Sequence, residues 1–425
     1  MLILLARHPI FSRSDGKGGM FYYYYYDVIT WVVGALALAW LIWYLVSRYR
    51  QARAFRRPRR STNYQLLKQV ARLKRELSSR YLRPGVSNNI HAVGIGILGG
   101  ANEYCIQIFI NDANQELWTG SGAAALPNSY RGVPIVPIEM PMASFLADAG
   151  ASLTATQYPN GIRERQEVII GGISGANTNL TGQSGTIGYF CTRKTRLPRR
   201  KEICLLSNSH VFADLRKANV DDGDLIMQPS PGEPSSNRPI GTLVHYSALK
   251  FNGNISEPNR VDAAFARLWA PLQHQPLIPL IGAVKGYVAT KDIVIGEAVR
   301  KFGRTTGYTE GHVFSICLDI WIRYDRTGQS AFFQDQFLIE PARPRFNKFV
   351  SGGDSGSLLI DADQHAIGLI FAGMSELPES LRSVPDIKVI AETDPAVETL
   401  KKIEGYGVAN PINEVLDRLK IDLVV

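Results

Sequence analysis

The chain has 425 residues, of which 45% are hydrophobic, so it can bury more than one core and we expect two or three folded units. Its net charge of +9 is unevenly placed: residues 1–83 hold sixteen Lys or Arg against three Asp or Glu, a net +13, which leaves −4 for residues 84–425. Because the larger part of the chain lacks the basic excess, we expect no nucleic-acid partner.

The first predicted element follows an N-terminal tail over residues 1–27. Val28 to Val46 contains no charged residue and is nineteen residues long. At about 1.5 Å per residue this is enough to cross a bilayer core of about 30 Å, and aromatic residues border both ends. The alternative is a cleaved signal peptide, but the stretch is long and lacks a small-residue cleavage site. We therefore predict a single transmembrane helix over residues 28–47.

The charges that flank this helix predict its orientation. Seven arginines lie between residues 48 and 60, whereas only Arg7, Arg13 and Lys17 precede the helix. Cytoplasmic flanks carry the excess of Lys and Arg, so the rest of the chain is expected in the cytoplasm. The periplasmic side is the alternative.

Residues 48–83 are predicted to form a basic juxtamembrane segment and an amphipathic helix over Tyr64 to Leu82. Apolar residues at helical spacing predict one buried face, and basic residues lie elsewhere on the helix: Leu66, Leu67, Val70, Leu73 and Leu77 against Lys68, Arg72, Lys74 and Arg75. The helix is either a short coiled coil or packs on the following module. Fewer than three heptads favour packing, and Pro84-Gly85 ends the helix.

Residues 84–165 are predicted to form a small α+β module. Strands are expected at Ile90–Leu98 and Glu103–Ile110, followed by the proline-marked stretch Val133–Glu139. Four glycines between residues 94 and 100 superficially suggest a phosphate loop, but no Lys-Ser or Lys-Thr pair and no helix start follow them. They are better explained as strand and turn glycines, and no ligand is assigned to the module.

From residue 166 to residue 425 short apolar strands alternate with turns of Gly, Pro and Asn. This pattern is typical of an all-β barrel or sandwich. A closing helix is expected over Pro411 to Leu419.

Within this part, Ser355 lies between glycines in the run Ser351-Gly-Gly-Asp-Ser-Gly-Ser, just before an apolar strand. A hydroxyl in such a loop suits acyl transfer, because the backbone can approach the reacting carbonyl and successive N–H groups can point at its oxygen. Upstream, His210 ends an apolar strand that runs into a Ser/Asn turn, and Asp262 opens another apolar strand.

These residues follow the order His, Asp, Ser that one group of hydrolases uses. Ser355 would be the nucleophile and His210 the general base, and Asp262 would hold the imidazole tautomer. A second interpretation of the acid stays open, since three other aspartates lie between His210 and Ser355: Asp221, Asp222 and Asp224.

With these motifs in this order, the sequence resembles the chymotrypsin-fold, trypsin-like serine peptidases. Val299 to Val313 looks like the strand, turn and strand that open the second barrel of the bacterial members. Gln228-Pro-Ser-Pro-Gly-Glu and Ala409-Asn-Pro-Ile-Asn-Glu-Val-Leu are similar to a branch related to the narrow-leaf peptidase of plants. The resemblance covers about residues 166–425 and extends more weakly back to about residue 84.

The resemblance implies an all-β fold of two six-stranded barrels with the triad in the cleft between them. It implies an oxyanion hole made by the backbone N–H groups of Gly353 and Ser355, and a structural role for Asp354. It further implies a specificity pocket formed by Phe349, Phe371, Ala372 and Gly373. Since none of these four side chains is negatively charged, a small or apolar residue is expected before the cleaved bond rather than Lys or Arg.

The resemblance also raises two questions about processing. Ile169-Ile-Gly-Gly looks like the new N-terminus that zymogens expose, whose amine pairs with the acid before the nucleophile, here Asp354; the favoured alternative is that Ile169 starts a strand and the uncut chain is competent. Cys191 and Cys204 flank a predicted hairpin and could form a bridge, although free thiols are expected in a reducing compartment.

The sequence therefore predicts a membrane-tethered serine endopeptidase acting on protein or peptide substrates, controlled by its tether or an unidentified regulatory protein. No metal or other cofactor is expected, because no CxxC pair or His-rich spacing occurs. The alternative function is a catalytically silent relative that serves as a membrane-anchored binding platform.

Overall fold

The structure is a computed structural model. It describes residues 29–44, 64–98, 103–113, 115–118, 126–145, 161–194, 202–215, 220, 223–251, 253–324, 329–374, 401–403 and 405–425. The chain divides into two compact units, Met1–Phe55 and Arg56–Val425. Of the first unit, residues 29–44 are described and are helical.

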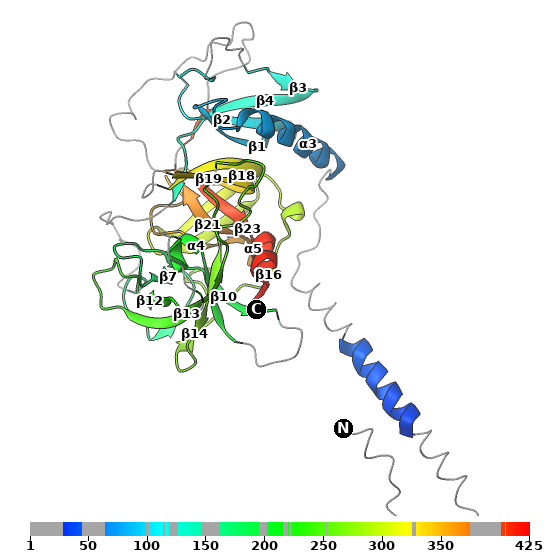
Figure 1. Ribbon diagram of the computed structural model, residues 1–425, viewed down its shortest axis with the longest axis vertical. Coiled ribbons are helices and arrows are strands. Elements are labelled where there is room, and N and C mark those ends of the chain that lie inside the picture. The colour runs from blue at the N-terminus through cyan, green and yellow to red at the C-terminus, as the bar shows by residue number, and fades with distance from the viewer. Residues whose placement is uncertain are drawn as a thin grey trace, which may run out of the picture. The chain divides into compact units, whose positions relative to one another are not determined.

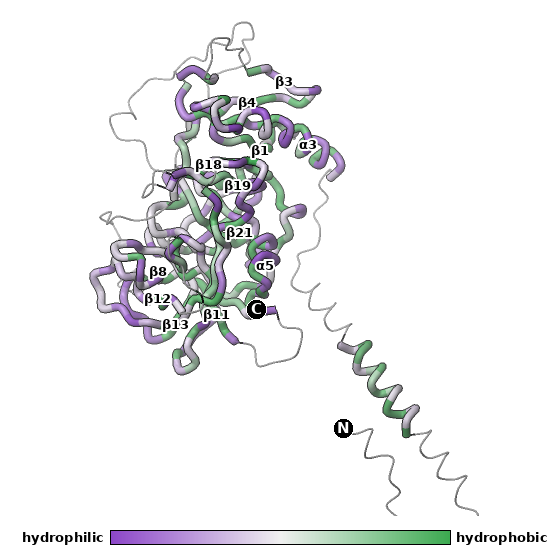
Figure 2. The backbone as a smooth tube through the Cα atoms, viewed as in Figure 1, coloured by the Kyte–Doolittle hydropathy of each residue, from purple (hydrophilic) through white to green (hydrophobic). Residues whose placement is uncertain are grey.

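The predicted transmembrane helix over residues 28–47 belongs to this first unit. Within the described ranges, no helix is both long and apolar enough to span a bilayer. Figure 2 shows that the helix at residues 29–44 is nonetheless mostly hydrophobic. The juxtamembrane arginines between residues 48 and 60 fall outside the described residues.

The second unit is mostly β-structure and contains a seven-stranded antiparallel sheet in the order β24-β10-β11-β14-β13-β12-β8. Its strands are Ile421–Leu423 (β24), Tyr189–Arg193 (β10), Cys204–Ser207 (β11), Ala264–Leu268 (β14), Arg238–Tyr246 (β13), Leu225–Gln228 (β12) and Ala176–Asn177 (β8). Two short pairs accompany it: Ile173–Ser174 (β7) with Thr186–Ile187 (β9), and Val168–Ile169 (β6) with Gln273–His274 (β15). Among the described residues no pairing joins β8 back to β24, so the described strands form an open seven-stranded sheet where a six-stranded barrel was expected.

A second set of six strands does close into a ring. The strands are Ala298–Gly303 (β17), Leu358–Asp361 (β20), His365–Gly373 (β21), Gly407–Pro411 (β23), Gln329–Pro341 (β19) and Gly307–Tyr324 (β18). Each pairs with the next, and β18 pairs back onto β17, so this part matches the expected six-stranded barrel. Gly286–Tyr287 (β16) adds to β21, and the 3-10 turn Thr290–Asp292 (η1) leads into β17.

The sheet extends beyond this barrel because β18 is eighteen residues long and its far end pairs with the N-terminal part of the unit. Ile90–Leu98 (β1), Glu103–Ile110 (β2), Val133–Glu139 (β4) and Lys401–Lys402 (β22) continue in that order, with Ser129–Tyr130 (β3) beside β4. The bounds of β1 and β2 agree with those predicted. Gly94 and Gly96 lie inside β1, where a Cβ would overlap Ser315 and Gln107, so close approach of neighbouring groups explains both glycines.

Tyr64–Tyr81 (α3) packs against β1 and β2, which favours the packed helix over the coiled coil (Figure 1). Its buried face differs from the predicted one in two respects, the first being that Leu66, expected on this face, is exposed. Lys74, expected away from this face, is fully buried between Val70 and Leu77, because Asp319 of β18 supplies an opposite charge beneath the helix. An apolar period alone cannot identify such a position, since the partner lies far away in sequence.

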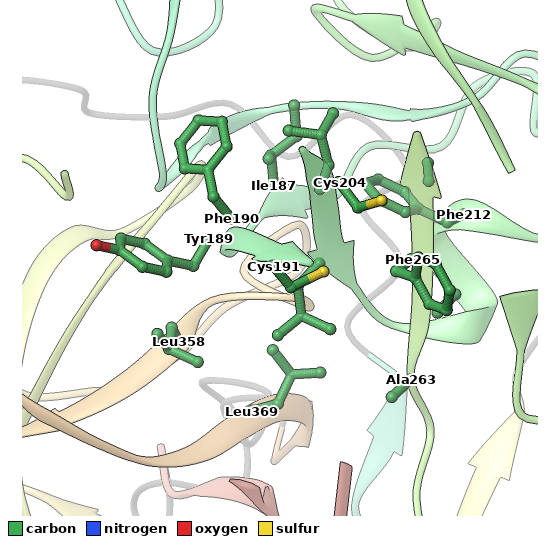
Figure 3. Close-up of a cluster of buried hydrophobic side chains, with 14 of the residues drawn as sticks. Ile187, Tyr189, Phe190, Cys191, Cys204, Phe212, Ala263, Phe265, Leu358 and Leu369 are labelled. Atoms are coloured by element: carbon green, nitrogen blue, oxygen red, sulfur yellow. The ribbon is translucent and has the colours of Figure 1, made fainter. Parts of the chain in front are cut away.

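The core of the seven-stranded sheet is continuous with the barrel. Figure 3 shows Tyr189, Phe190 and Phe265 from the sheet with Leu358 and Leu369 from β20 and β21. The helix Ile412–Leu419 (α5), predicted as Pro411 to Leu419, contacts β21 and β23, and the chain then enters the seven-stranded sheet as β24. The C-terminal segment thus ties the two sheets together.

Cys191 and Cys204 lie directly opposite each other on β10 and β11, as the predicted hairpin requires. All four cysteines are free thiols. Burial raises the pKa of Cys204 to about 12 and raises the pKa of Cys191 well above its ordinary value. Both side chains therefore act as apolar core groups (Figure 3).

Candidate active site

His210 and Asp262 come from adjacent elements of the seven-stranded sheet. β11 ends at Ser207, and the short helix Ser209–Phe212 (α4) carries His210 at its second position. Asp262 lies two residues before β14, the strand that pairs with β11. This antiparallel pairing, which matches Ser207 with Ala264, brings the end of one strand to the start of the other.

The two side chains are in direct contact. His210 Nδ1 lies 2.5 Å from Asp262 Oδ2, and the backbone N–H of His210 donates to Oδ1 over 3.2 Å. A carboxylate only accepts hydrogen bonds, so Nδ1 carries the hydrogen and Nε2 is the basic nitrogen. Asp262 is completely buried, and the His210 side chain is only 9% exposed. The arrangement fixes the tautomer that a general base for a hydroxyl requires.

Two asparagines hold the backbone of Asp262. Asn410 Oδ1 accepts the N–H of Asp262 over 3.0 Å, and the side-chain amides of Asn208 and Asn410 both donate to its carbonyl, at 2.7 and 3.1 Å. Tyr324, at the end of β18, faces the carboxylate: burial and then the negative charge of Asp262 raise the pKa of this phenol, so it keeps its proton. Sequence reasoning did not identify these three residues as parts of the site.

Three other aspartates were considered as the partner of His210, and the structure describes one of them. Asp224 accepts hydrogen bonds from Asn177 and Asn179, at 2.9 and 3.2 Å. Asp221 and Asp222 lie outside the described residues.

Ser355 lies in the loop between β19 and β20, and the packing of this loop brings the barrel to the turn that carries His210. The N–H of Thr186 donates to the carbonyl of Ser355 over 2.8 Å, and the Ser207 hydroxyl donates to the carbonyl of Thr186 over 2.7 Å. Gly356 has φ of +95°, and a Cβ there would collide with Thr186 and Ser207, so only glycine allows this approach. The Ser355 hydroxyl donates to the carbonyl of Phe371 over 3.2 Å.

The expected oxyanion loop is fixed by Asp354. The buried carboxylate accepts the backbone N–H groups of Ser351, Thr305 and Thr306, at 2.9 to 3.0 Å, and pairs with Lys301 Nζ at 3.3 Å. Burial lowers the pKa of Lys301, and the charge of Asp354 opposes this change. Within the described part of the chain, the N–H groups of Gly353 and Ser355 donate to no other group, so both stay available to a developing oxyanion.

A second buried ion pair joins the two sheets beside this loop. Glu233, in the loop between β12 and β13, accepts from Arg304 Nε and, over 2.9 Å, from Arg163 Nε. The backbone N–H of Arg304 donates to Thr186, whose hydroxyl donates to the carbonyl of Gly353 over 2.8 Å. Lys301, Arg304 and Glu233 lie within the motifs that carry the resemblance. That Lys301 pairs with Asp354, and Arg304 with Glu233, in the protein interior is shown only by the structure.

The four residues expected to form a specificity pocket come from the loop before Ser355 and from β21. Phe349, Phe371 and Ala372 are fully buried. β23 connects them, because Gly407 pairs with Gly373 and packs against Phe349. All four pocket residues are uncharged.

Within the described residues, no group of three or more His, Cys, Asp or Glu side chains could hold a metal ion.

No family model matches the chain. The protein NARROW LEAF 1 of Oryza sativa subsp. japonica is 24% identical over 263 residues, which are 57% of this chain and 40% of that protein. The chain therefore spans less than half of the length of this relative.

Three of the solved structures similar to this chain are proteases. Thermobifida fusca protease A is 18% identical and covers 61% of this chain and 99% of its own, with a TM-score of 0.37. Cellulomonas bogoriensis chymotrypsin and the Nocardiopsis protease are 16% and 17% identical, with TM-scores of 0.35 and 0.37. Each covers 60% of this chain and nearly all of its own, at 98% and 99%.

Proposed function

We propose that the chain is a serine endopeptidase that hydrolyses peptide bonds through Ser355, His210 and Asp262. The observation that carries this proposal is the 2.5 Å contact between a buried carboxylate and His210 Nδ1. The proposal is supported by the loop of Ser355, whose carbonyl accepts the N–H of Thr186, while the carbonyl of Thr186 accepts the hydroxyl of Ser207 at the end of β11. Such a carboxylate–imidazole pair activates a hydroxyl nucleophile.

The chemistry follows from these positions. Ser355 Oγ attacks the scissile carbonyl carbon while its proton passes to His210 Nε2, and the N–H groups of Gly353 and Ser355 stabilise the oxyanion. The C–N bond then breaks, His210 gives the proton to the leaving amine, and an acyl-enzyme remains. Water attacks this ester with the same base, which restores Ser355. Asp262 balances the imidazolium charge in both steps.

The uncut chain is proposed to be competent. Asp354, the acid that a newly exposed N-terminal amine would pair with, already pairs with Lys301. Ile169 is buried in β6, and its carbonyl accepts from the N–H of Gln275 over 2.9 Å. These contacts support an active site that needs no proteolytic cut.

We also propose that the enzyme prefers a small or apolar residue before the cleaved bond. The reason is that the expected pocket residues carry no negative charge: Phe349, Phe371, Ala372 and Gly373. A guanidinium entering there would lose its hydration without gaining a carboxylate partner. Cleavage profiling with a peptide library tests this preference, and a dominant Arg or Lys would contradict it.

Membrane tethering with a cytoplasmic peptidase is also proposed, on the sequence of residues 28–47 and the arginines that follow it. Green fluorescent protein fused at the C-terminus should be fluorescent, and alkaline phosphatase fused there should be inactive. The reverse pattern would place the enzyme in the periplasm, and recovery of the intact chain in the soluble fraction would remove the tether.

The central test is labelling with a fluorophosphonate, which reacts with an activated serine. The unaltered chain should be labelled and Ser355→Ala should not. Ser351→Ala, which removes another hydroxyl of the same loop, is the matched control and should keep the label. A folded but unlabelled chain would instead favour the catalytically silent platform.

A further inference from the structure

Strand β21 has one edge that the barrel leaves uncovered next to Ser355. On one side β23 pairs along its length, matching Ala372 with Val408 and Gly373 with Gly407. On the other side β20 pairs only up to Leu369. The barrel therefore leaves the second edge of Ala372 and Gly373 open, immediately after Phe371, whose carbonyl accepts the Ser355 hydroxyl.

A short strand from the N-terminal part of the unit occupies this edge. Ser144–Phe145 (β5) pairs antiparallel with β21, with Ser144 opposite Gly373 and Phe145 opposite Ala372. Because residue 144 faces residue 373 and residue 145 faces residue 372, the direction of β5 leads toward Phe371 and thus toward Ser355. An extended peptide that presents a bond to Ser355 along this edge would have the same direction.

The contacts before β5 hold it in this place. The carbonyl of Ala143 accepts the N–H of Arg323 over 3.0 Å, and Ser144 pairs in parallel with Arg323 of β18. The N–H of Met142 donates to Asn111 over 3.2 Å, and Ala143 is completely buried. The strand is therefore inserted between β18 and β21.

We propose that Ser144–Phe145 is an intramolecular occupant of the sheet edge that a peptide substrate needs. The inference rests on the proposed peptidase function. β5 and an extended peptide substrate require the backbone N–H and C=O groups on the same edge of Ala372 and Gly373, so they exclude each other. Turnover of an extended peptide then requires displacement of β5, whereas a small fluorophosphonate does not need this edge.

The first experiment displaces the strand in the full chain. Ala143→Asp places a carboxylate at a completely buried position, which favours release of β5. We expect kcat/KM for a quenched peptide library to rise about tenfold, the equivalent of one to two backbone hydrogen bonds, while the rate of fluorophosphonate labelling stays unchanged. Unchanged or lower peptide turnover with full labelling would overturn the proposal.

The second experiment locks the strand and does not depend on the first variant folding. Directly opposite residues of an antiparallel pair have Cα atoms about 4.5–5.5 Å apart, a separation that a disulfide can bridge. Ser144→Cys combined with Gly373→Cys should therefore form a reversible cross-link. The oxidised form should turn over peptides at least about tenfold more slowly than the reduced form, with equal labelling by the fluorophosphonate.

Gly373→Cys alone, oxidised and reduced, controls for the new side chain and for oxidation itself. If the cross-linked and reduced forms of the double variant turn over peptides equally fast, and both are labelled by the fluorophosphonate, the inference is contradicted although the peptidase site is intact. Absence of Ser355-dependent labelling in the unaltered chain would instead contradict the proposed function.

Discussion

Lys74 in α3 and Asp319 in β18 form an ion pair with 2.7 Å between Nζ and Oδ1, and both side chains are shielded from water. Asp335 of β19 lies 3.8 Å from the same Nζ and also pairs with Arg260 at 2.8 Å. Arg260 precedes Asp262 by two residues, so the helix connects through a series of ion pairs to the segment that carries the proposed catalytic acid.

Lys74→Met should reduce the free energy of unfolding by about 3–5 kcal/mol, because it leaves the buried carboxylate of Asp319 without its partner. Urea denaturation measures this change. Lys74→Met combined with Asp319→Leu should recover most of the loss, since no charge then remains unpaired. Lys68→Met, an exposed position of the same helix, should change stability by less than about 0.5 kcal/mol.

Asp354→Asn should slow fluorophosphonate labelling of Ser355 by about 10²-fold. The neutral amide leaves the buried Lys301 ammonium unpaired and offers only one acceptor to the loop that presents the oxyanion donors. The rate of labelling at a fixed probe concentration checks this prediction. Asp363→Asn, at an exposed turn, is the control; a labelling rate equal to that of the control would show that the loop does not need this charge.

Asn410→Ala should lower kcat about tenfold with little change in KM, because it removes contacts to the backbone N–H and carbonyl of Asp262 but none to the proposed pocket. Steady-state kinetics with a peptide substrate measure both constants. Asn413→Ala, on the next turn of the chain, removes contacts to Thr290 instead and should leave kcat unchanged. A rise in KM alone would argue against a positioning role.

His91 in β1 makes stability depend on pH. Burial lowers its pKa to about 4, below the value of about 6.5 for an unfolded chain, so the folded state disfavours protonation. The stabilising effect is complete above about pH 6.5 and is lost as the pH falls toward 4. Between pH 7 and pH 5 the loss should be about 2 kcal/mol, and His91→Leu should abolish this component in urea denaturation at the two pH values.

The bounds of several elements could be predicted from sequence because local patterns determine them. The apolar period and Pro84-Gly85 identified α3, and β1 and β2 were predicted with the bounds that the structure gives. The glycine-flanked run around Ser355 and the strand ends at His210 and Asp262 identified three candidate site residues. Loop chemistry and strand alternation are encoded within a few residues, so they are readable without the fold.

The pairing of distant segments was decided only by the tertiary structure. Nothing near Lys74 predicts that Asp319, some 245 positions later, neutralises it. Likewise the sequence did not indicate that β1 continues the sheet of β18, or that Ser144–Phe145 lies on the edge of β21. Strand partners and buried ion pairs depend on which surfaces meet after the chain has folded, and hydrogen-bonding edges are chemically alike in every strand. The sequence alone therefore determined the chemistry proposed for the site, whereas the fold decided what holds the site and what covers it.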